Sequence, residues 1–544
     1  MAQAKTVERK SATRKTTRAP SAPKEVKSFD PATGELIDSV PVTTPAQVEK
    51  IDEEVARIQP GWGLTPIVER LAVIRRAAEV LIRRGEELGL LVTREHGKTL
   101  VESSIVDVGQ TVLILDWLAR YAHRYLAPER IPDPPATKYK RHWVFHRPLG
   151  VVGIIGPWNY PLAIPMGEAA FALAAGNGVI LKPSEYTPLI AEEIASVFAE
   201  AGLPDGVLRV IQGFGETGAA LCKAGPVKKI FFTGSTATGR KVMETAARHG
   251  KPTMLELGGK DPAIVCADAD LERAVNGTLW AGFFNEGQTC VSVERVYVDR
   301  RVYDDYVSLL VERAKRMRPG DPKEPDTDIG PMNNQMQYEK VVEQLEDARD
   351  QGATLECGGP VEVPDLKGKF IAPTVLTGVD HSMKIMTDET FGPVIPVMPV
   401  DSEQEAIRLA NDTPYGLGAS IWSRDLTRAR VLAEQIDAGM VWINDHAYTH
   451  SLGHLPWGGV KDSGTGVKYS KYGLYDMSEI RLIAEDSGRL PAAHWYPYDE
   501  VKKRGFGAVV EILASSGRDR IRALREHRVE LGALIRQLRG KNGS

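Results

Sequence analysis

Three polar side chains from separate segments could together act on a carbonyl carbon. Cys290 ends the segment "FFNEGQTC", while Asn159 in "GPWNYP" and Glu256 in "LELGGK" each follow an apolar, strand-like run. A thiolate is a nucleophile, an amide can donate to an oxyanion, and a carboxylate can accept a proton. Each residue alone is more often structural, because free cysteine is usually buried and inert, and loop Asn and Glu often cap helices. The combination of the three favours chemistry.

Two glycine-rich turns are candidates for binding a dinucleotide. The first, "GFGETG" at 213–218, matches G-x-G-x-x-G, although any tight turn after a strand also needs glycine. The second, "FFTGSTATGR" at 231–240, leaves a strand and enters a helix with Gly234 and Ser235 at its start. Open amides and hydroxyls at a helix N-terminus suit a pyrophosphate, so we prefer the second turn.

A lysine and a glutamate follow another predicted strand, in "LKPSEYTP" at 181–188. Lys182 can bond a ribose or neutralise a phosphate, whereas Glu185 accepts from a diol and repels a 2′-phosphate. Ligands of open α/β sheets bind at the carboxyl ends of strands, where both residues are expected. The pair therefore favours NAD over NADP, with an exposed ion pair as the structural alternative.

The composition fits an enzyme of at least two domains. The chain has 544 residues and a mass of 59.6 kDa, more than one hydrophobic core usually supports. A net charge of −4 gives no field for gathering nucleic acid. Its four cysteines form no C-x-x-C pair, which predicts reduced thiols, no metal site and a cytoplasmic location. The most apolar stretch, 149–181, is interrupted by prolines and a glutamate, and predicts no transmembrane helix.

Hydrophobic periodicity predicts two α/β layers beside a helical layer. Residues 45–125 show helical spacing, and the strand-like runs that follow alternate with helix-length stretches, as in parallel sheets covered on both faces. An alternating segment at 138–148 with a proline-rich entry predicts a hairpin. The strands predicted for the first layer are "VVGII" (151–155), "GVIL" (178–181), "VLRVI" (207–211), "KIFF" (229–232) and "PAIV" (262–265). Those predicted for the second layer are "RVYVD" (295–299), "TVLTGV" (374–379), "VIPVMPV" (394–400), "ASIWS" (419–423) and "MVWIN" (440–444).

Seven motifs in one order make the chain resemble the aldehyde dehydrogenase superfamily over roughly residues 28–488. They are "PWNYP", "KPSE", "FTGSTATG", "LELGGK", "NEGQTC", "ETFGPV" and "PWGGVKDSG". The resemblance implies two Rossmann-like open α/β domains and a small β arm for oligomerisation into a homodimer or homotetramer. The implied boundaries are a disordered basic tail (1–27), a coenzyme-binding domain (28–137 and 151–258), a catalytic domain (259–465), the arm (138–150 and 466–488) and a C-terminal extension (489–544).

The resemblance also assigns roles to the candidate residues. Cys290 would attack an aldehyde, Glu256 would act as base, and the Asn159 side chain with the Cys290 amide would bind the oxyanion. The resulting thioester would be hydrolysed to the acid. The implied contacts to the NAD or NADP coenzyme are Trp158 and Ser235 with Gly234 at the pyrophosphate, Lys182 and Glu185 at the adenosine ribose, Glu389 and Phe391 at the nicotinamide ribose and ring, and Leu257.

One departure concerns the end of the last motif. Many relatives continue it as S-G-x-G-R-E, whereas this chain reads "SGTGVKYS", with Val467 and Lys468 in place of Arg and Glu. A proton relay through that second carboxylate is therefore not expected. The presence of Glu256 weighs against the branch that transfers the thioester to coenzyme A, which is one alternative function. A non-catalytic scaffold that retains the fold is the other.

Substrate and partners are less constrained by the sequence. Small residues at Ala163 and Gly167 suggest a roomy channel, and nearby aromatic residues suggest a bulky apolar or aromatic aldehyde, although core packing explains them equally well. The C-terminal segment "GRDRIRALREHRVELGALIRQLRGK" has apolar residues at near-helical spacing among many arginines. Such a helix packs on a partner subunit or, less favoured here, lies peripherally on an anionic membrane.

Overall fold

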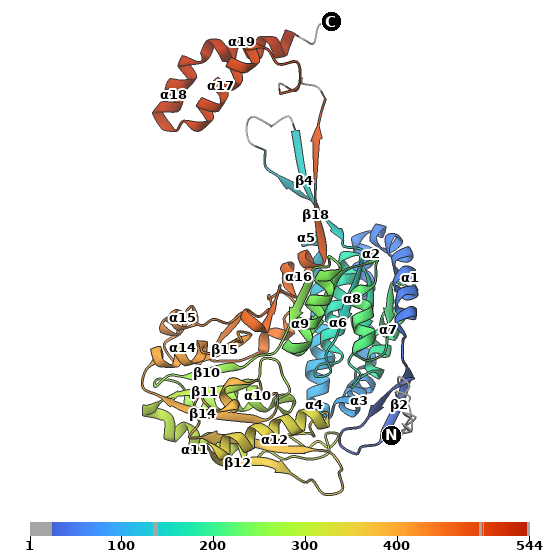
Figure 1. Cartoon of the computed structure of the whole chain (residues 1–544), viewed down its shortest axis with the longest axis vertical. Coiled ribbons are helices and arrows are strands. Elements are labelled where there is room, and N and C mark those ends of the chain that lie inside the picture. The colour runs from blue at the N-terminus through green and yellow to red at the C-terminus, as the bar shows by residue number, and fades with distance from the viewer. Residues whose placement is uncertain (1–23, 134–139, 489–491, 493, 541–544) are drawn as a thin grey trace, which may run out of the picture. The chain divides into compact units, whose positions relative to one another are not determined.

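The computed structural model describes residues 24–133, 140–488, 492 and 494–540 and divides into two compact units. The larger unit comprises residues 24–127 and His146–Glu479, and the smaller unit comprises Pro128–Phe145 and the described residues from Ile480 onward (Figure 1). Residues 1–23 of the predicted tail lie outside the described residues. The tail prediction extended too far, because β1 (Glu25–Phe29) already pairs with β2 (Leu36–Pro41) within its last residues.

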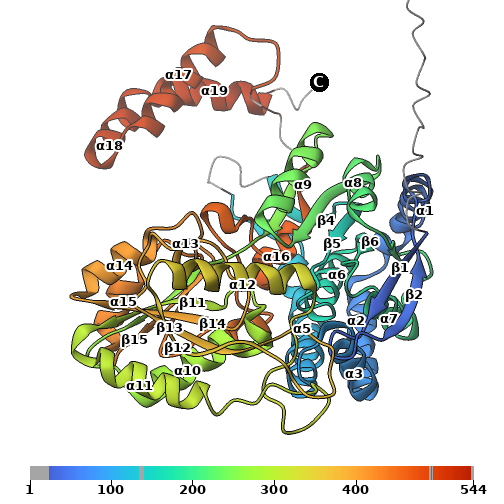
Figure 2. The same cartoon turned by 60° about the horizontal axis from the view of Figure 1, so that its bottom comes forward.

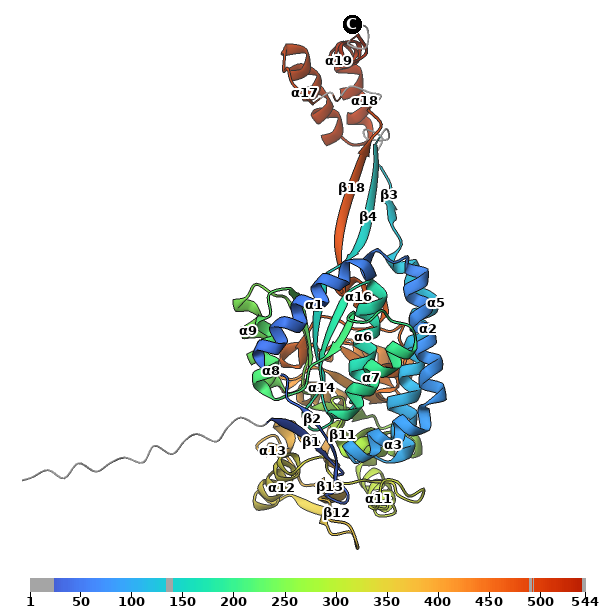
Figure 3. The ribbon, with the colours of Figure 1, turned by 90° about the vertical axis from the view of Figure 1, so that its right-hand side faces the viewer.

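The helical layer predicted for residues 45–125 is confirmed. Its amphipathic helices pack against one another, with α2 and α5 side by side (Figure 3). One turn between α4 and α5 is a π-helix, a rare geometry that often marks functional sites. The elements are α1 (Pro45–Leu64), α2 (Ile67–Arg83), α3 (Gly85–His96), α4 (Leu100–Glu102), η1 (Ser103–Gly109) and α5 (Gln110–Leu126).

The first sheet has six strands in the order β17-β9-β8-β5-β6-β7, all parallel except β17. Every residue of β5 and β6 is buried, as expected for strands covered on both faces. Every residue of α6 is buried as well, which places this helix at the centre of the larger unit. The strands are β5 (Val151–Ile155), β6 (Gly178–Lys182), β7 (Leu208–Val210), β8 (Val227–Thr233), β9 (Thr253–Glu256) and β17 (Gly464–Thr465). The connecting helices are α6 (Ala163–Ala175), α7 (Leu189–Glu200), α8 (Gly215–Lys223) and α9 (Thr236–Arg248).

The second sheet has seven strands in the order β12-β13-β14-β11-β10-β15-β16, parallel except at β12. Figure 2 shows α10 and α11 on one side of this sheet and α12 and α13 on the other. The strands are β10 (Asp261–Val265), β11 (Val293–Asp299), β12 (Thr354–Val361), β13 (Phe370–Thr377), β14 (Val394–Val400), β15 (Gly418–Trp422) and β16 (Met440–Ile443). The helices are α10 (Leu271–Phe283), α11 (Tyr303–Ala314), α12 (Gln335–Asp350), α13 (Lys384–Thr387), α14 (Glu403–Asn411) and α15 (Leu426–Ala433), with short 3₁₀ turns η3 (Phe284–Gly287), η4 (Arg300–Val302), η5 (Tyr448–Ser451) and η6 (Lys461–Ser463).

The predicted fold class, two open α/β layers, is confirmed. All ten predicted strands are present. The grouping of "PAIV" with the first layer is wrong, because β10 pairs with β11 and β15 in the second sheet, on the catalytic side of the predicted boundary near residue 258. The chain then returns to the first half, because β17 pairs with β9 and α16 (Ser470–Asp476) packs on α5 and α6. The segment 466–477, which we predicted to lie in the arm, therefore belongs to the larger unit.

The smaller unit combines three strands with three helices. β3 (Glu129–Ile131), β4 (Lys140–Pro148) and β18 (Ser478–Asp486) form a sheet in the order β18-β4-β3, and β3 and β4 are antiparallel, as the hairpin prediction required. The turn between them lies outside the described residues. Helices α17 (Glu500–Ala514), α18 (Gly517–Glu526) and α19 (Arg528–Gly540) confirm that the C-terminal extension is helical. No helix within the described residues is both long and apolar enough to cross a membrane.

Candidate active site

One cavity of about 860 Å³ in the larger unit brings together ten of the eleven residues singled out in the sequence. Such a volume is ample for a cofactor and a small substrate. Glu256 is the one candidate that does not line the cavity. The ten lining residues are Trp158, Asn159, Lys182, Glu185, Gly234, Ser235, Leu257, Cys290, Glu389 and Phe391.

The loop that carries Cys290 has an unusual backbone. Asn285, Glu286 and Gly287 have φ angles of 58°, 56° and 69°, all in the left-handed region. A Cβ on Gly287 would lie 2.2 Å from the main-chain oxygen of Gly392, so only glycine fits there. The thiol follows a strained, tightly packed turn, which is typical of functional sites.

Burial governs the acidity of the Cys290 thiol. Desolvation raises the pKa of Cys290 to about 12; the nearby Lys468 is the largest opposing influence, and Glu256, Asp261 and Glu389 raise the pKa further. The resting thiol is therefore protonated at neutral pH. Of the two routes to a reactive thiolate, a depressed pKa or a base within reach, this site requires the base.

Glu256 has the properties of such a base. It ends β9 and is 3% exposed, and neither carboxylate oxygen accepts a hydrogen bond of good geometry within the described part of the chain. Burial raises the pKa of Glu256 to about 7, Lys468 opposes this rise, and the Trp457 indole lowers the pKa least of all. A carboxylate whose pKa is close to neutrality is well suited to take and return protons.

The two glycines after Glu256 allow other parts of the site to approach. A Cβ on Gly258 would lie 2.5 Å from Oε1 of Glu389, and one on Gly259 would lie 2.3 Å from the main-chain oxygen of Cys290. The main-chain N–H of Gly259 donates to Glu389 Oε1 at 3.2 Å. The segment "LELGGK" therefore carries the base and packs its two glycines against the main chain of Cys290 and the predicted ribose-binding carboxylate of Glu389.

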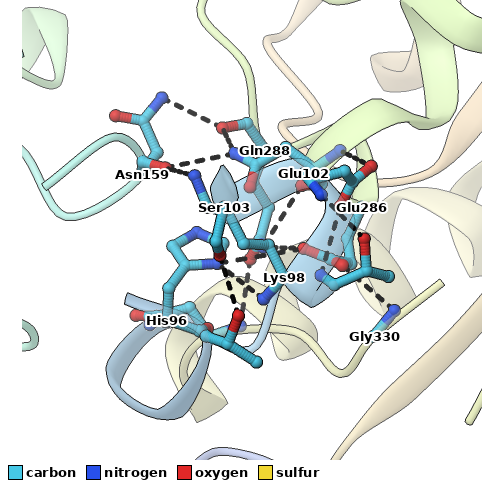
Figure 4. A network of polar contacts seen from close by, with 12 residues as sticks. His96, Lys98, Glu102, Ser103, Asn159, Glu286, Gln288 and Gly330 are labelled. Atoms are coloured by element: carbon cyan, nitrogen blue, oxygen red, sulfur yellow. Dashed lines mark hydrogen bonds and ion pairs between the residues drawn. The ribbon is translucent and has the colours of Figure 1, made fainter. Parts of the chain in front are cut away.

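Asn159 is held by a buried polar network (Figure 4). Its side-chain Nδ2 donates to the main-chain oxygen of Gln288 at 3.0 Å, and Lys98 Nζ donates to the main-chain oxygen of Asn159 at 2.7 Å. Lys98 is fully buried and forms an ion pair with Asp107 at 2.7 Å. Asp107 Oδ1 in turn accepts from the main-chain N–H groups of Leu162 and Ala163.

Two buried carboxyl groups fix the cysteine loop from the other side of this network. Glu102 Oε1 accepts from the main-chain N–H of Asn285, and Glu286 Oε1 accepts from that of Gly330, both at 3.0 Å. Burial raises the pKa of both Glu102 and Glu286. No sequence pattern indicates this network, because its members are scattered over more than 200 positions.

The predicted phosphate loop has the expected form. Ser235 is the N-cap of α9, and its hydroxyl accepts from the main-chain N–H of Thr238 at 3.3 Å. In the competing turn "GFGETG", a Cβ on Gly213 would lie 2.2 Å from Thr217 Oγ1, so that glycine serves packing. The comparison favours the second turn as the phosphate site.

The remaining candidates line the same cavity. Lys182 Nζ lies 3.9 Å from Glu185 Oε2. Because Lys182 is only 4% exposed, the pair is not the exposed ion pair considered as the structural alternative. The rings of Trp158 and Phe391 meet edge to face at 5.4 Å. Glu389 lies 3.6 Å from Lys340, a lining residue that sequence reasoning missed. Burial raises the pKa of Glu389, and Lys340 opposes the rise.

This set of groups fits a dinucleotide. A helix N-terminus with a hydroxyl cap offers donors to a pyrophosphate, and the Lys182–Glu185 pair offers a donor and an acceptor to a ribose diol. Glu389 offers carboxylate oxygens on the side of the cavity that holds Cys290. The cavity therefore holds donors and acceptors of the kinds that a dinucleotide requires.

Comparison with known proteins agrees with this geometry. The model of the aldehyde dehydrogenase family matches residues 18–483. A protein named betaine aldehyde dehydrogenase from Mesorhizobium japonicum is 40% identical over 462 residues, which cover 84% of this chain and 93% of that protein. The chain belongs to the aldehyde dehydrogenase family.

The chain is also similar to several solved structures. An aldehyde dehydrogenase from Brucella melitensis biovar abortus shares 37% identity at a TM-score of 0.81, covering 85% of this chain and 94% of that one. An NAD⁺ complex of an aldehyde dehydrogenase from Bacillus cereus shares 34% identity (TM-score 0.81; 85% and 94%), and an NADP-dependent enzyme from E. coli shares 35% (TM-score 0.81; 85% and 95%). The protein is an NAD(P)-dependent enzyme that oxidises aldehydes.

Proposed function

We propose that the enzyme converts an aldehyde to its carboxylic acid through a thioester on Cys290, with Glu256 as general base and Asn159 as oxyanion donor. The observation that carries this proposal is the position of Cys290. It lies in the cavity of the coenzyme-binding residues, and the charge of Glu256 acts on its thiol. The thiol is not enclosed in hydrocarbon, which would have excluded the mechanism.

The first step forms the bond between sulfur and carbon. Glu256 takes the thiol proton, the Cys290 sulfur attacks the aldehyde carbon, and the carbonyl oxygen becomes an oxyanion. Asn159 Nδ2, which donates to Gln288 in the free enzyme, turns to this oxygen together with the Cys290 amide; a donor of this kind contributes roughly 10²- to 10³-fold in rate. Bound NAD(P)⁺ supplies the hydride acceptor.

The second step releases the acid. Glu256 first releases the thiol proton to solvent and then takes a proton from water; the resulting hydroxide attacks the thioester carbon, and the carbon–sulfur bond breaks with the thiolate as leaving group. The deep burial of Glu256 keeps its carboxyl group close to half-ionised at neutral pH, so it can accept a proton in each step. No step needs a metal-bound water.

The coenzyme is oriented by the remaining lining residues. Ser235 and Gly234, with Trp158, bind the pyrophosphate; Lys182 and Glu185 bind the adenosine ribose; Glu389 binds the nicotinamide ribose beside Phe391 and Leu257. The carboxylate of Glu185 repels a 2′-phosphate, which favours NAD over NADP.

The aldehyde that this site accepts best is apolar or aromatic. Tyr160 and Phe284 stack at 6.4 Å, and His450 meets Trp457 edge to face at 4.5 Å. Lys98 Nζ lies 4.1 Å from the centre of the Tyr160 ring and already occupies a ring face that could otherwise hold a quaternary ammonium such as that of betaine aldehyde. The space beside Gly167 is not a channel, because a Cβ there would lie 3.3 Å from the Tyr469 hydroxyl.

Assembly and location are also proposals. In β18, Ile480 and Leu482 are 74% and 62% exposed, which supports pairing of the arm within a homodimer or homotetramer. Helices α17–α19 expose several apolar residues among arginines, which favours contact with a partner subunit over a membrane surface. All four cysteines are free, which supports a cytoplasmic location.

The test is the formation of NADH and NADPH with aliphatic, aromatic and quaternary-ammonium aldehydes, with and without coenzyme A. Wild-type enzyme should be active without coenzyme A and fastest with aromatic aldehydes. Cys290→Ala should lose at least about 10³-fold in kcat/KM. Activity that depends on coenzyme A would support the acylating alternative, and full activity of Cys290→Ala would remove Cys290 as nucleophile.

A further inference from the structure

Lys468 is a buried cation beside the reacting groups that the mechanism above does not use. It lies between β17 and α16 and is 4% exposed. Its Nζ is 3.4 Å from Oε1 of Glu168, which lies on α6 and is 1% exposed.

The pair is held in place on both sides. The main chain of Lys468 exchanges two hydrogen bonds with Trp457, at 2.8 and 3.0 Å. Glu168 Oε1 also accepts from the Thr233 hydroxyl at 3.1 Å, and Thr233 is paired with Glu256 across β8 and β9. The cation is therefore fixed to the strand that ends in the base.

The charges around the reacting groups differ in sign. The groups acting on the Cys290 thiol are Glu256, Asp261 and Glu389, which raise its pKa, and Lys468, which lowers it. The groups acting on Glu256 include Glu168, which raises its pKa, and Lys468, which lowers it. Around Lys468 itself lie Glu168, Tyr469, Glu256, Cys290 and His450.

We propose that Lys468 is a positioning residue whose positive charge, anchored by Glu168, favours the ionised forms of Cys290 and Glu256. The inference rests on the proposed roles of these two residues. It places one cation among the carboxyl groups of Glu256, Asp261 and Glu389, which oppose ionisation of the thiol, so that less work is left to the base.

The alternative is that the ion pair has a purely structural role. Substitutions of its two members distinguish this role from the proposed one. Breaking a buried pair from either side destabilises the fold. Only the loss of Lys468 removes the positive charge from the thiol. Loss of the Glu168 charge removes a nearby negative charge, while the two main-chain hydrogen bonds to Trp457 still hold Lys468 beside the site.

The experiment measures alkylation of Cys290 by iodoacetamide in the full-length enzyme, followed by mass spectrometry of its peptide between pH 6 and 10. Lys468→Met should slow alkylation at pH 8 by about tenfold or more, corresponding to one pKa unit. Lys468→Arg should stay within about threefold of wild type, because it retains the charge. Glu168→Gln should alkylate no more slowly than wild type.

Lys229→Met is the matched control, since Lys229 is also buried and pairs with Asp476 at 2.5 Å but is not among the groups acting on the thiol. It should leave alkylation unchanged. Lys468→Gln retains a donor for Glu168 and replaces Lys468→Met if that variant does not fold.

Two outcomes overturn the inference: wild-type alkylation in Lys468→Met, or equal slowing in Lys468→Met and Glu168→Gln. Failure of the proposed function is seen separately, because aldehyde oxidation that survives Cys290→Ala removes the thioester mechanism. The alkylation series reports the charge effect in either case.

Discussion

The side-chain ammonium of Lys98 donates to the main-chain oxygen of Asn159 at 2.7 Å. The same ammonium pairs with Asp107, whose other oxygen accepts from the first amides of the helix that follows Asn159. Lys98 and Asp107 therefore hold the strand-to-helix turn that presents the Asn159 side chain to the cavity. The π-helical turn that contains Asp107 is what places its carboxylate there.

Replacement of Asp107 by Asn should lower kcat by roughly 10- to 100-fold, because loss of the ion pair shifts the oxyanion donor. The affinity for NAD⁺ and the rate of Cys290 alkylation should not change, since Asp107 is not among the groups that line the coenzyme cavity or act on the thiol. Steady-state kinetics and coenzyme titration by fluorescence measure these quantities.

Lys229→Met again serves as the control for loss of a buried charge. It should lower stability without a selective effect on kcat. An Asp107→Asn enzyme with wild-type kcat would show that the turn keeps its form without the ion pair.

The pKa of Glu256 leads to a prediction about stability. Burial raises this pKa from 4.5 to about 7, so the folded protein binds the proton more tightly than the unfolded chain. Such a group stabilises the fold below pH 4.5, and the contribution is lost as pH rises through about 7. Glu256→Gln should therefore be more stable than wild type at pH 8, by at most about 3 kcal/mol.

At pH 4.5 and below the two proteins should have nearly equal stability, which makes the pH series its own control. Urea denaturation at pH 4 and pH 8 measures the difference. A Glu256→Gln variant less stable than wild type at pH 8 would mean that the carboxylate makes favourable contacts in its ionised form. The variant should also lose aldehyde oxidation. This result would show that the Glu256 carboxylate serves catalysis although it destabilises the fold.

The sheets could be predicted because their signal is local. Buried parallel strands such as β5 and β14 are short apolar runs, and their bounds match the prediction residue for residue. Edge strands carry no such signal: β12 is mostly exposed, and β17 has two residues held by pairing with β9. The return of the chain to the first sheet after Ser463 is a tertiary feature, which is why the arm boundary was placed too early.

Some residues of the candidate site could likewise be predicted from the sequence, and others could not. Cys290, Asn159 and Glu256 lie in motifs whose residue types suggest their chemistry. Lys98 lies in the short loop between α3 and α4, and Glu168 lies inside the fully buried helix α6. A loop lysine gives no periodic signal, and Glu168 shows in the sequence only as an interruption of the apolar stretch 149–181; burial and ion pairing distinguish both residues.

Coenzyme choice should depend on Glu185. Glu185→Gln should raise kcat/KM for NADP⁺ relative to NAD⁺ by about tenfold, because it removes the negative charge that faces a 2′-phosphate. Glu216→Gln, within "GFGETG" and in the first turn of α8, should leave the ratio unchanged. If this ratio changed more in Glu216→Gln than in Glu185→Gln, the 2′-phosphate would instead be assigned to the turn that contains Glu216.

The backbone before the nucleophile should tolerate no side chain. Gly287 has a φ of 69°, and a Cβ there would lie 2.2 Å from the Gly392 oxygen. Gly287→Ala should lower the free energy of unfolding by about 2 kcal/mol or more and reduce activity, because the loop must shift.

Gly61→Ala is the matched control: Gly61 lies within α1 with no atom within 4 Å of its added Cβ, and Ala there should stabilise the protein by about 0.5–1 kcal/mol. Urea denaturation and aldehyde oxidation assays compare the two variants, and a fully active, stable Gly287→Ala enzyme would show that the loop relaxes without disturbing Cys290.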